Sequence, residues 1–224
     1  MPRDFRNEEP QFNYEEWKPK TRIGQMVKNH EITSVEQIFS MGRQIKEVEI
    51  VDTLLPNLQD NVLEIASVQR MTKNNRKQKY RVTVIIGDRS GHVGLGFGKD
   101  VEVKPAIETA IKDAKRNIIS IDLGCGSWEC NCGTKHTLPF TVKARCGSSE
   151  VILKPAPRGV GVVASKTIRS VLELAGIKDL WTFARGRTRN RYNAALATYN
   201  ALKSLHEMKN LEALKVAAGS QPSS

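Results

Sequence analysis

The sequence predicts an α+β protein in which two packed units follow an N-terminal extension. Between residues 61 and 122, three strand-like stretches precede one helical pattern, an order typical of an antiparallel sheet covered on one face by a helix. A second set of strand and helix patterns occupies residues 137–206, and the glycine- and cysteine-rich segment 123–136 separates the two sets. We therefore expect two sheets joined through a junction at 123–136.

The first 60 residues are predicted to form an acidic extension with short helices. They carry 8 Lys and Arg against 11 Asp and Glu, a net charge of −3. Residues 1–20 hold three prolines and no periodic apolar pattern, which predicts an extended arm that depends on a partner for its conformation. Two short helices are expected between residues 21 and 40.

The first packed unit, residues 61–122, has the clearest strand patterns. Runs rich in β-branched residues predict strands at 62–68 and 80–86, with a basic loop at 73–77 between them, and a glycine-rich run after the turn at 87–91 predicts a third strand at 92–98. Apolar residues at helical spacing then predict one helix, through Val103, Ile107, Ala110, Ile111, Ala114 and Ile118.

The second packed unit, residues 137–206, combines a hairpin with helices. Gly176 follows an apolar helical pattern in the position of a C-terminal cap. Residues 207–224 end in small and polar residues and are expected to be a flexible tail. The predicted elements are a hairpin of 138–145 with 150–154, a glycine-rich turn at 158–161, a helix at about 165–175, a strand near 180–184 and a helix at about 191–206.

The charge of the chain favours a polyanionic partner. The net charge is +11. Residues 61–224 carry 27 Lys and Arg against 13 Asp and Glu, so the packed units hold the positive charge and nucleic acid is a natural partner for them. No run of 18 apolar residues and no hydrophobic signal core occur, so we expect no membrane partner and a cytoplasmic location. The four cysteines are then thiols or metal ligands rather than disulfides.

One basic cluster is predicted at a hairpin tip. Six basic residues and no acidic residue lie between Arg70 and Arg81. Their long side chains can straddle phosphates, while neighbouring amides reach base edges or riboses. The alternative is a solvated loop, but so many like charges repel one another unless they are neutralised. We expect RNA contact from Arg70, Lys73, Asn74, Asn75, Arg76, Lys77, Lys79 and Arg81.

A second basic cluster has an arginine at every second position, Arg185, Arg187, Arg189 and Arg191. In an extended backbone alternate residues share a face, so the four guanidinium groups would form one row. Arginine binds phosphate through two parallel hydrogen bonds, which favours a structured nucleic acid as the partner. The alternative is a loop whose charges only keep the protein in solution.

Two glycine-rich segments imitate nucleotide-binding loops. The first, Gly94–Lys99, lacks the residues of a Walker A loop, because Val93 stands where glycine is needed and Asp100 where Ser or Thr is needed. Glycine in a strand instead marks the close approach of another backbone, and an RNA backbone qualifies.

The second segment, Gly159–Ala164, fits the pattern G-x-G-x-x-A, with Asp179 20 residues beyond its first glycine. It keeps a nucleotide-dependent small-molecule enzyme open as the alternative function. However, no long alternation of parallel strands and helices surrounds the segment. Exposed amides before a helix bind any phosphate, including one in RNA, and Arg158 suits either use. No catalytic constellation is found in the sequence, so we expect no catalytic residue.

Three cysteines and one histidine lie within twelve residues: Cys125, Cys130, Cys132 and His136. Such a set is suited to structural zinc, and the interleaved glycines permit tight ligand turns. The spacing is not a common zinc spacing, so free thiols in a junction loop remain the alternative. A zinc ion with four protein ligands would be structural, since no coordination position stays open. No other cofactor is expected.

Several runs of the chain form a specific combination in this order: Trp17–Thr21, Gly87–Asp88, Gly91–Gly96, Ala106–Ile107, Ala114–Lys115, His136–Pro139, Gly147–Ser148, Leu153–Gly161 and Leu174–Asp179. Together they make the chain resemble small-subunit ribosomal protein five in its archaeal and eukaryotic form. The resemblance covers residues 17–206, and the cysteine-bearing junction looks archaeal.

The resemblance implies a double-stranded-RNA-binding-like β-β-β-α domain, followed by an α/β two-layer sandwich with a left-handed β-α-β crossover. It also implies a structural protein of the small ribosomal subunit that binds small-subunit rRNA near the decoding centre and the mRNA entry. Its expected neighbours are ribosomal proteins four and eight, and its expected roles are subunit assembly and translational accuracy.

The resemblance also places RNA contacts. The family's rRNA-contacting hairpin loop falls on Lys73–Lys79, and its glycine-rich strand on Gly91–Gly98. The further RNA-binding residues that we expect are Gly91, His92, Gly94, Gly96, Lys99 and Arg158.

Overall fold

The computed structural model describes the backbone of residues 17–130 and 132–219, and the side chains of these residues as far as Leu205. Residues 1–16 of the expected arm and residues 220–224 of the expected tail lie outside the described residues. The chain divides into two compact units, Met1–Pro56 and Asn57–Ser224.

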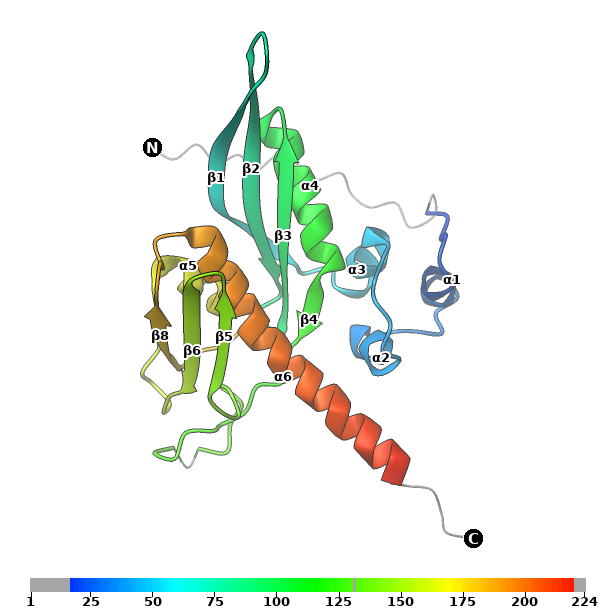
Figure 1. The fold of residues 1–224 in the computed structure, drawn as a ribbon. Coiled ribbons are helices and arrows are strands. Elements are labelled where there is room, and N and C mark those ends of the chain that lie inside the picture. The colour runs from blue at the N-terminus through cyan, green and yellow to red at the C-terminus, as the bar shows by residue number, and fades with distance from the viewer. Residues whose placement is uncertain (1–16, 131, 220–224) are drawn as a thin grey trace. The chain divides into compact units, whose positions relative to one another are not determined.

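The described residues of the first unit, from Trp17 on, form three short helices, α1 (Arg22–Lys28), α2 (Val35–Ser40) and α3 (Val48–Leu54) (Figure 1). The first two lie where short helices were expected, and α3 was not expected. The hydroxyl oxygen of Thr21 accepts a hydrogen bond of 3.1 Å from the backbone N–H of Gly24 and so caps α1. Each helix contributes apolar side chains to the buried interior, among them Val27, Ile38 and Ile50.

Four antiparallel strands form the first sheet of the second unit, in the order β1-β2-β3-β4. They are β1 (Gln59–Met71), β2 (Arg76–Gly87), β3 (His92–Asp100) and β4 (Ile118–Ser120), and α4 (Val103–Arg116) follows β3 (Figure 1). The three expected strands are all present, and each is longer than expected.

One residue of the expected helix belongs to a strand instead. Ile118 continues the apolar spacing of α4, but Asn117 ends the helix and Ile118 pairs with Gly94 in the sheet. The prediction that Ile118 is helical was wrong. Side-chain spacing reports which face is buried, and a strand that starts immediately after a helix can bury the same face.

The glycines of β3 let α4 approach the sheet. A Cβ atom added at Gly94, Gly96 or Gly98 would collide with the backbone carbonyl oxygens of Ala114, Ala110 and Ala106, respectively. All three alanines of α4 are fully buried. The close backbone approach that the glycines indicated is therefore made by a helix of the same chain.

The second sheet has the order β5-β6-β8-β7, in which only β7 and β8 are parallel. Its strands are β5 (Val142–Cys146), β6 (Ser149–Pro155), β7 (Val162–Val163) and β8 (Leu180–Arg185), and its helices are α5 (Lys166–Leu174) and α6 (Arg191–Gly219). The hairpin begins at residue 142 rather than 138, and the two-residue strand β7 was not expected. The last helix continues well beyond the expected end at residue 206.

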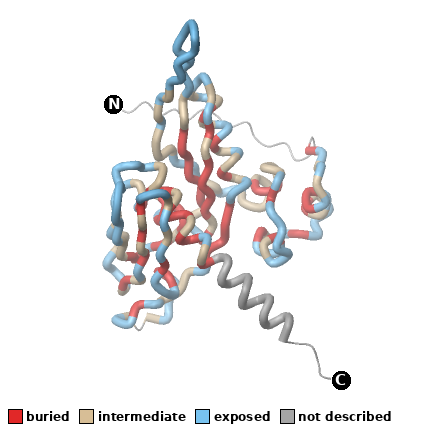
Figure 2. The backbone as a smooth tube through the Cα atoms, viewed as in Figure 1, coloured by how far each residue is buried: buried red, intermediate tan, exposed pale blue. Residues whose placement is uncertain are grey.

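Both sheets contribute to one hydrophobic core, which Figure 2 shows as the buried segments between them. Leu95 of β3, Leu172 of α5 and Leu202 of α6 are all members of this core. The backbone N–H of Arg89 also donates a hydrogen bond of 3.0 Å to the carbonyl oxygen of Leu174. The two sheets of the second unit therefore pack on one core as a single compact unit. Within the described part of the chain, no helix combines the length and apolarity needed to cross a membrane.

Candidate nucleic-acid interface and candidate metal centre

The β1–β2 hairpin extends beyond the rest of its sheet (Figure 1). The last residue pair between β2 and β3 is Tyr80 with Asp100, whereas β1 and β2 remain paired as far as Met71 with Arg76. Every residue from 69 to 79 is exposed, as the hairpin tip in Figure 2 shows. A two-stranded ribbon with no third strand and no apolar face is marginally stable in water by itself.

A tight loop closes the hairpin at residues 72–75. The hydroxyl group of Thr72 donates a hydrogen bond of 2.6 Å to the carbonyl oxygen of Asn75, and the backbone N–H of Thr72 donates to the same oxygen at 2.8 Å. The side-chain oxygen of Asn75 accepts a hydrogen bond of 2.7 Å from the backbone N–H of Arg76. Asn75 therefore supports the turn, while Lys73 and Asn74 are exposed at the tip.

The basic side chains of this hairpin differ in how exposed they are and in whether they contact the rest of the protein. Arg70, Lys73, Arg76, Lys77 and Lys79 are all exposed on the two-stranded ribbon. Arg81 is half-buried, and its guanidinium carbon lies 5.2 Å from the ring centre of Tyr192 on α6, which is cation–π distance. Lys99, the partner of Arg81 in the β2–β3 register, is exposed at the base of the hairpin.

The expected RNA contacts on the glycine-rich strand do not fit the structure. Gly91, Gly94 and Gly96 are buried, and α4 covers the last two. RNA contact at Gly94 and Gly96 stays an untested prediction that their burial disfavours, because absent side chains reveal a close neighbour but not which neighbour it is.

His92 is largely enclosed as well, and its Nδ1 lies 2.7 Å from the Oδ2 atom of Asp88. Burial disfavours the charged form of Asp88, but hydrogen bonds from the backbone of Ser90 and from His92 outweigh it and lower the pKa of Asp88. Asp88 also accepts hydrogen bonds from the backbone N–H groups of Ser90, at 2.7 Å, and His92, at 3.1 Å. This arrangement stabilises the β2–β3 turn.

The row of four arginines is not extended. Arg185 ends β8, Gly186 has a φ of +80° and Arg191 begins α6. The backbone N–H of Asn190 donates a hydrogen bond of 3.3 Å to the carbonyl oxygen of Arg187, so a turn replaces the expected extended segment. The prediction of one shared face was wrong, because it assumed extended backbone through a glycine in left-handed conformation. All four arginines are nevertheless exposed around this loop, which we name the arginine loop (residues 185–191).

The glycine loop at residues 158–161 is already occupied by a side chain of the same protein. The Oδ1 atom of Asp179 accepts hydrogen bonds from the backbone N–H groups of Gly159, at 3.0 Å, and Gly161, at 2.8 Å. Asp179 is buried, with 5% of its surface exposed. Its carboxylate thus takes the place that a phosphate would need, and Arg158 is exposed at the edge of the loop.

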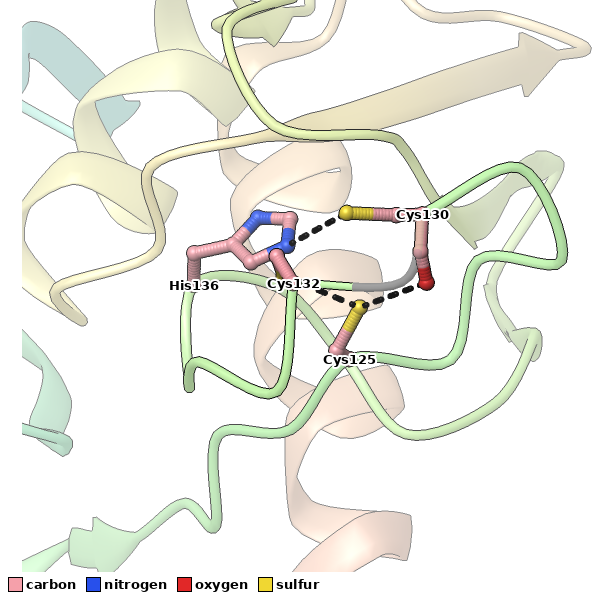
Figure 3. Close-up of side chains that lie close together, drawn as sticks. All are labelled: Cys125, Cys130, Cys132 and His136. Carbon is pink, nitrogen blue, oxygen red and sulfur yellow. Dashed lines mark hydrogen bonds between the residues drawn. The ribbon is translucent and has the colours of Figure 1, made fainter.

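The three cysteines and the histidine of the junction converge on one point (Figure 3). The sulfur atoms of Cys125, Cys130 and Cys132 and a ring nitrogen of His136 all lie within 4.8 Å of one another. The sulfurs of Cys125 and Cys132 are 3.5 Å apart, and the sulfur of Cys130 is 3.7 Å from Nε2 of His136. Two thiolates bound to one tetrahedral zinc ion are separated by about 3.8 Å, so the set has the size of a zinc site.

The environment of the thiols differs between two of these cysteines. Burial, followed by hydrogen bonds with Cys132 and Cys130, raises the pKa of Cys125. The hydroxyl group of Thr134, which lies 3.2 Å from the sulfur of Cys132, is the main cause that lowers the pKa of Cys132 to about 6. A thiolate is the form that binds metal, so Cys132 is prepared for that role. The fourth cysteine, Cys146 on β5, is not a member of the cluster.

Asp179 also contacts the metal-ligand candidate His136. Its Oδ2 atom lies 2.9 Å from Nδ1 of His136, while Nε2 faces the cysteine sulfurs (Figure 3). A carboxylate on the second ring nitrogen is the usual support of a zinc-binding histidine. The spacing of 20 residues between Gly159 and Asp179 was read as part of a nucleotide-binding pattern, and this supporting role of Asp179 was missed. No signal in the sequence relates residue 179 to residue 136.

Comparisons with known proteins match the residues of both sheets to the same protein family. The family described as "Ribosomal protein S5, N-terminal domain" matches residues 58–122, and the family described as "Ribosomal protein S5, C-terminal domain" matches residues 144–215.

Relatives named "Small ribosomal subunit protein uS5" cover most of the chain. The one from Methanocaldococcus jannaschii is 50% identical over 208 residues, 93% of this chain and 96% of the relative. Those from Methanoregula boonei and Methanococcoides burtonii are 53% and 54% identical over 188 residues, 84% of this chain and 92% and 89% of the relatives.

Proposed function

The chain belongs to the ribosomal protein S5 family, and from that premise we propose that it is a structural constituent of the small ribosomal subunit. We propose that it binds rRNA through the β1–β2 hairpin. It is a ribosomal protein of archaeal type, located on the cytoplasmic ribosome, and not an enzyme. The observation that carries the proposed contact is the exposed two-stranded ribbon of residues 69–79, whose side chains include five Lys and Arg and no Asp or Glu.

The ribbon is suited to a polyanion for an energetic reason. Its basic side chains repel one another in water, and no apolar face compensates for this repulsion. Contact with phosphates would neutralise the charges and release counterions, which favours binding at low salt. The core shared by both sheets holds the base of the ribbon, so the basic residues approach the RNA as an ordered set. The amide of Asn74 at the tip can add contacts to bases or riboses.

Two further exposed groups are proposed RNA contacts. The arginine loop exposes Arg185, Arg187, Arg189 and Arg191 around a turn. Its guanidinium groups can therefore bind phosphates that lie in different directions from the loop. Arg158 on the glycine loop and Lys99 at the base of the hairpin complete the set. His92 and Gly91 support the β2–β3 turn and are not proposed as contacts.

The resemblance supports a finer placement, which belongs to the same proposal. The protein would lie near the decoding centre and the mRNA entry, beside ribosomal proteins four and eight, and would support subunit assembly and translational accuracy. The three strands and helix of residues 61–122 would be a variant of the double-stranded-RNA-binding fold, joined through 123–136 to an α/β sandwich at 137–206. The parallel pairing of β7 and β8, which α5 connects, supports a β-α-β crossover here, and we propose that it is the left-handed one.

We also propose that the Cys125, Cys130, Cys132 and His136 cluster binds a structural zinc ion. Four ligand atoms within 4.8 Å of one another and a carboxylate behind the imidazole support this proposal. Four protein ligands fill a tetrahedral shell, so the ion would stabilise the junction loop and would not activate water. Elemental analysis of protein purified without added zinc tests this role, and less than one zinc per chain after mild purification would contradict it.

The nucleotide-dependent enzyme considered as an alternative is disfavoured by the glycine loop itself. The carboxylate of Asp179 accepts hydrogen bonds from the amides that would have to bind a phosphate. A second anion at the same amides would be repelled by this buried carboxylate.

Charge reversal at the hairpin tests the RNA contact. The double variant Arg76→Glu/Lys77→Glu should bind purified small-subunit rRNA at least tenfold more weakly, with a flatter dependence on salt. The control variant Lys104→Glu/Arg116→Glu makes the same change in net charge at exposed positions of α4. Equal losses in both variants would attribute binding to net charge alone and remove the hairpin as the specific contact.

A further inference from the structure

Asp179 lies between the cysteine–histidine cluster and the glycine loop, and each of its two carboxylate oxygens serves one of them. Oδ2 is 2.9 Å from Nδ1 of His136, and Oδ1 accepts hydrogen bonds from the amides of Gly159 and Gly161. The two partners come from segments more than twenty residues apart in the sequence. The carboxylate is buried, so these donors replace the water that would otherwise solvate it.

Backbone hydrogen bonds join the same two segments. The N–H groups of Lys178 and Asp179 lie 3.1 and 3.3 Å from the carbonyl oxygen of His136, and the N–H of Leu180 donates to the carbonyl oxygen of Gly161 at 3.1 Å. Residues 178–180 are thus bonded to the cluster on one side and to the glycine loop on the other. A change in the orientation of Asp179 would be felt by both.

Metal binding would fix that orientation through the tautomer of His136. A zinc ion on Nε2 leaves the ring proton on Nδ1, which then donates a hydrogen bond to Oδ2 of Asp179. Without the ion, a neutral imidazole can instead carry its proton on Nε2, and the lone pair of Nδ1 then faces the carboxylate oxygen. The hydrogen bond that holds Oδ2 is then lost, so the carboxylate is oriented less firmly and its hydrogen bonds with the glycine amides weaken.

We propose that Asp179 is a positioning residue that couples zinc binding at Cys125, Cys130, Cys132 and His136 to the order of the glycine loop at 158–161, and so to the presentation of Arg158. This inference rests on the proposed structural zinc ion. Gly159 and Gly161 have φ angles of +94° and +74° and a Cβ atom at either would meet nothing within 4 Å, so packing at these positions does little to fix the loop. The two hydrogen bonds to Asp179 therefore hold the loop to the interior, together with the backbone hydrogen bond from Leu180 to Gly161.

Amide hydrogen exchange on the full-length protein tests the coupling. Protein stripped with a chelator is compared with the same protein reconstituted with ZnCl2, and peptides that cover residues 156–162 are followed. We expect zinc to slow exchange of the Gly159 and Gly161 amides on the order of tenfold. A peptide from the hairpin, residues 69–80, serves as the internal control and should exchange equally in both states.

Two variants separate the coupling from the metal site. Asp179→Asn has only one acceptor oxygen, so it can serve His136 or the glycine amides but not both, and it should lose the zinc-dependent protection while its zinc affinity falls about 10- to 100-fold. Asp60→Asn, an exposed change on β1, is the matched control. Cys132→Ser removes a ligand without touching Asp179 and should also abolish the protection, which keeps the test valid if Asp179→Asn does not fold.

The outcomes are distinguishable. Zinc that binds without changing exchange at 156–162 would overturn the coupling and leave the zinc site intact, as would zinc-dependent protection that persists in Asp179→Asn. A chromogenic chelator assay that detects no zinc binding to the wild-type protein would overturn the proposed zinc site and the coupling together.

Discussion

The hydroxyl group of Tyr199 on α6 donates a hydrogen bond of 2.7 Å to the backbone carbonyl oxygen of Asn117, 82 residues earlier in the chain, at the end of α4. Burial raises the pKa of Tyr199, in keeping with a phenol that keeps its proton and acts as a donor. The bond connects α6, which packs on the second sheet, to Asn117, the residue that directly precedes β4 of the first sheet. It satisfies a carbonyl at a helix end, which has no partner within the helix.

Replacing Tyr199 by phenylalanine should therefore destabilise the fold without emptying the core. We expect the free energy of unfolding to fall by about 1 kcal/mol, the usual net value of one hydrogen bond, because the ring remains in place. Urea denaturation measures the change. Tyr192→Phe is the control, since the ring of Tyr192 packs on Phe97 with 4.4 Å between ring centres and this contact survives the substitution.

A methyl group at Gly96 should be far more costly. The Cβ atom of Gly96→Ala would collide with the backbone of Ala110 and Ala114, and neither can rotate away as a side chain could. We expect a loss of about 3 kcal/mol, at the upper end of ordinary overpacking, with separation of α4 from β3. Gly124→Ala, whose new Cβ atom would meet Pro139 at 3.4 Å, is the milder comparison. Equal thermal stability of the two variants would contradict the close packing of α4.

Single neutral substitutions at the hairpin tip should act on RNA binding and not on stability. Lys73→Gln and Lys79→Gln each remove one exposed charge from the ribbon. Each should lower the slope of log affinity against log salt by about one, as expected for one lost phosphate contact, and leave the unfolding midpoint unchanged. Titrations of rRNA at several salt concentrations give the slope. A variant that weakens binding equally at every salt concentration would indicate a contact other than phosphate.

The pair of Asp88 and His92 predicts a pH dependence of stability. The folded-state pKa of Asp88 lies below the ordinary value of an aspartate, so its contribution is present above about pH 4 and is lost as pH falls through the lower folded value. Asp88→Asn should cost about 1 kcal/mol at pH 7, discounted for the partial exposure of the site, and much less near pH 2. Denaturation at both pH values measures the difference. A cost that does not shrink in acid would show that shape rather than charge matters at this turn.

Local patterns in the sequence were sufficient to predict the longer strands and most of the helices. The strands around Val84 and Leu95 have apolar faces that only a buried sheet explains, and Gly176 was correctly placed as a helix stop, with a φ of +83°. These signals arise within a few residues, where backbone preference and side-chain burial act together. The hairpin tip follows in the same way from the turn at 72–75.

The errors arose where the decisive neighbour is distant in sequence. The glycines of β3 showed that something approaches closely, but Ala110 and Ala114 are identified only by folding the chain. The alternating arginines suggested one face, and the conformation of Gly186 removed it. Asp179 lies 43 residues from His136, and its hydrogen bonds to two segments leave no pattern in the sequence. The cysteine cluster was found because its ligands are close together along the chain.

Removal of zinc should destabilise the second unit through the junction loop. The described residues of the loop, 124–130 and 132–138, contain no helix or strand longer than the single bridge of Gly124 with Thr137, so the cluster would supply much of its order. At a zinc concentration a thousand times the dissociation constant, binding to the folded state alone contributes about 4 kcal/mol. Thermal unfolding with and without a chelator should therefore show a large drop in midpoint for the wild-type protein. Cys132→Ser should unfold at the lower midpoint in both conditions. Cys146→Ser, which leaves the cluster complete, should keep the chelator-sensitive midpoint, and loss of that sensitivity in Cys146→Ser would mean that the metal is held by a different set of ligands.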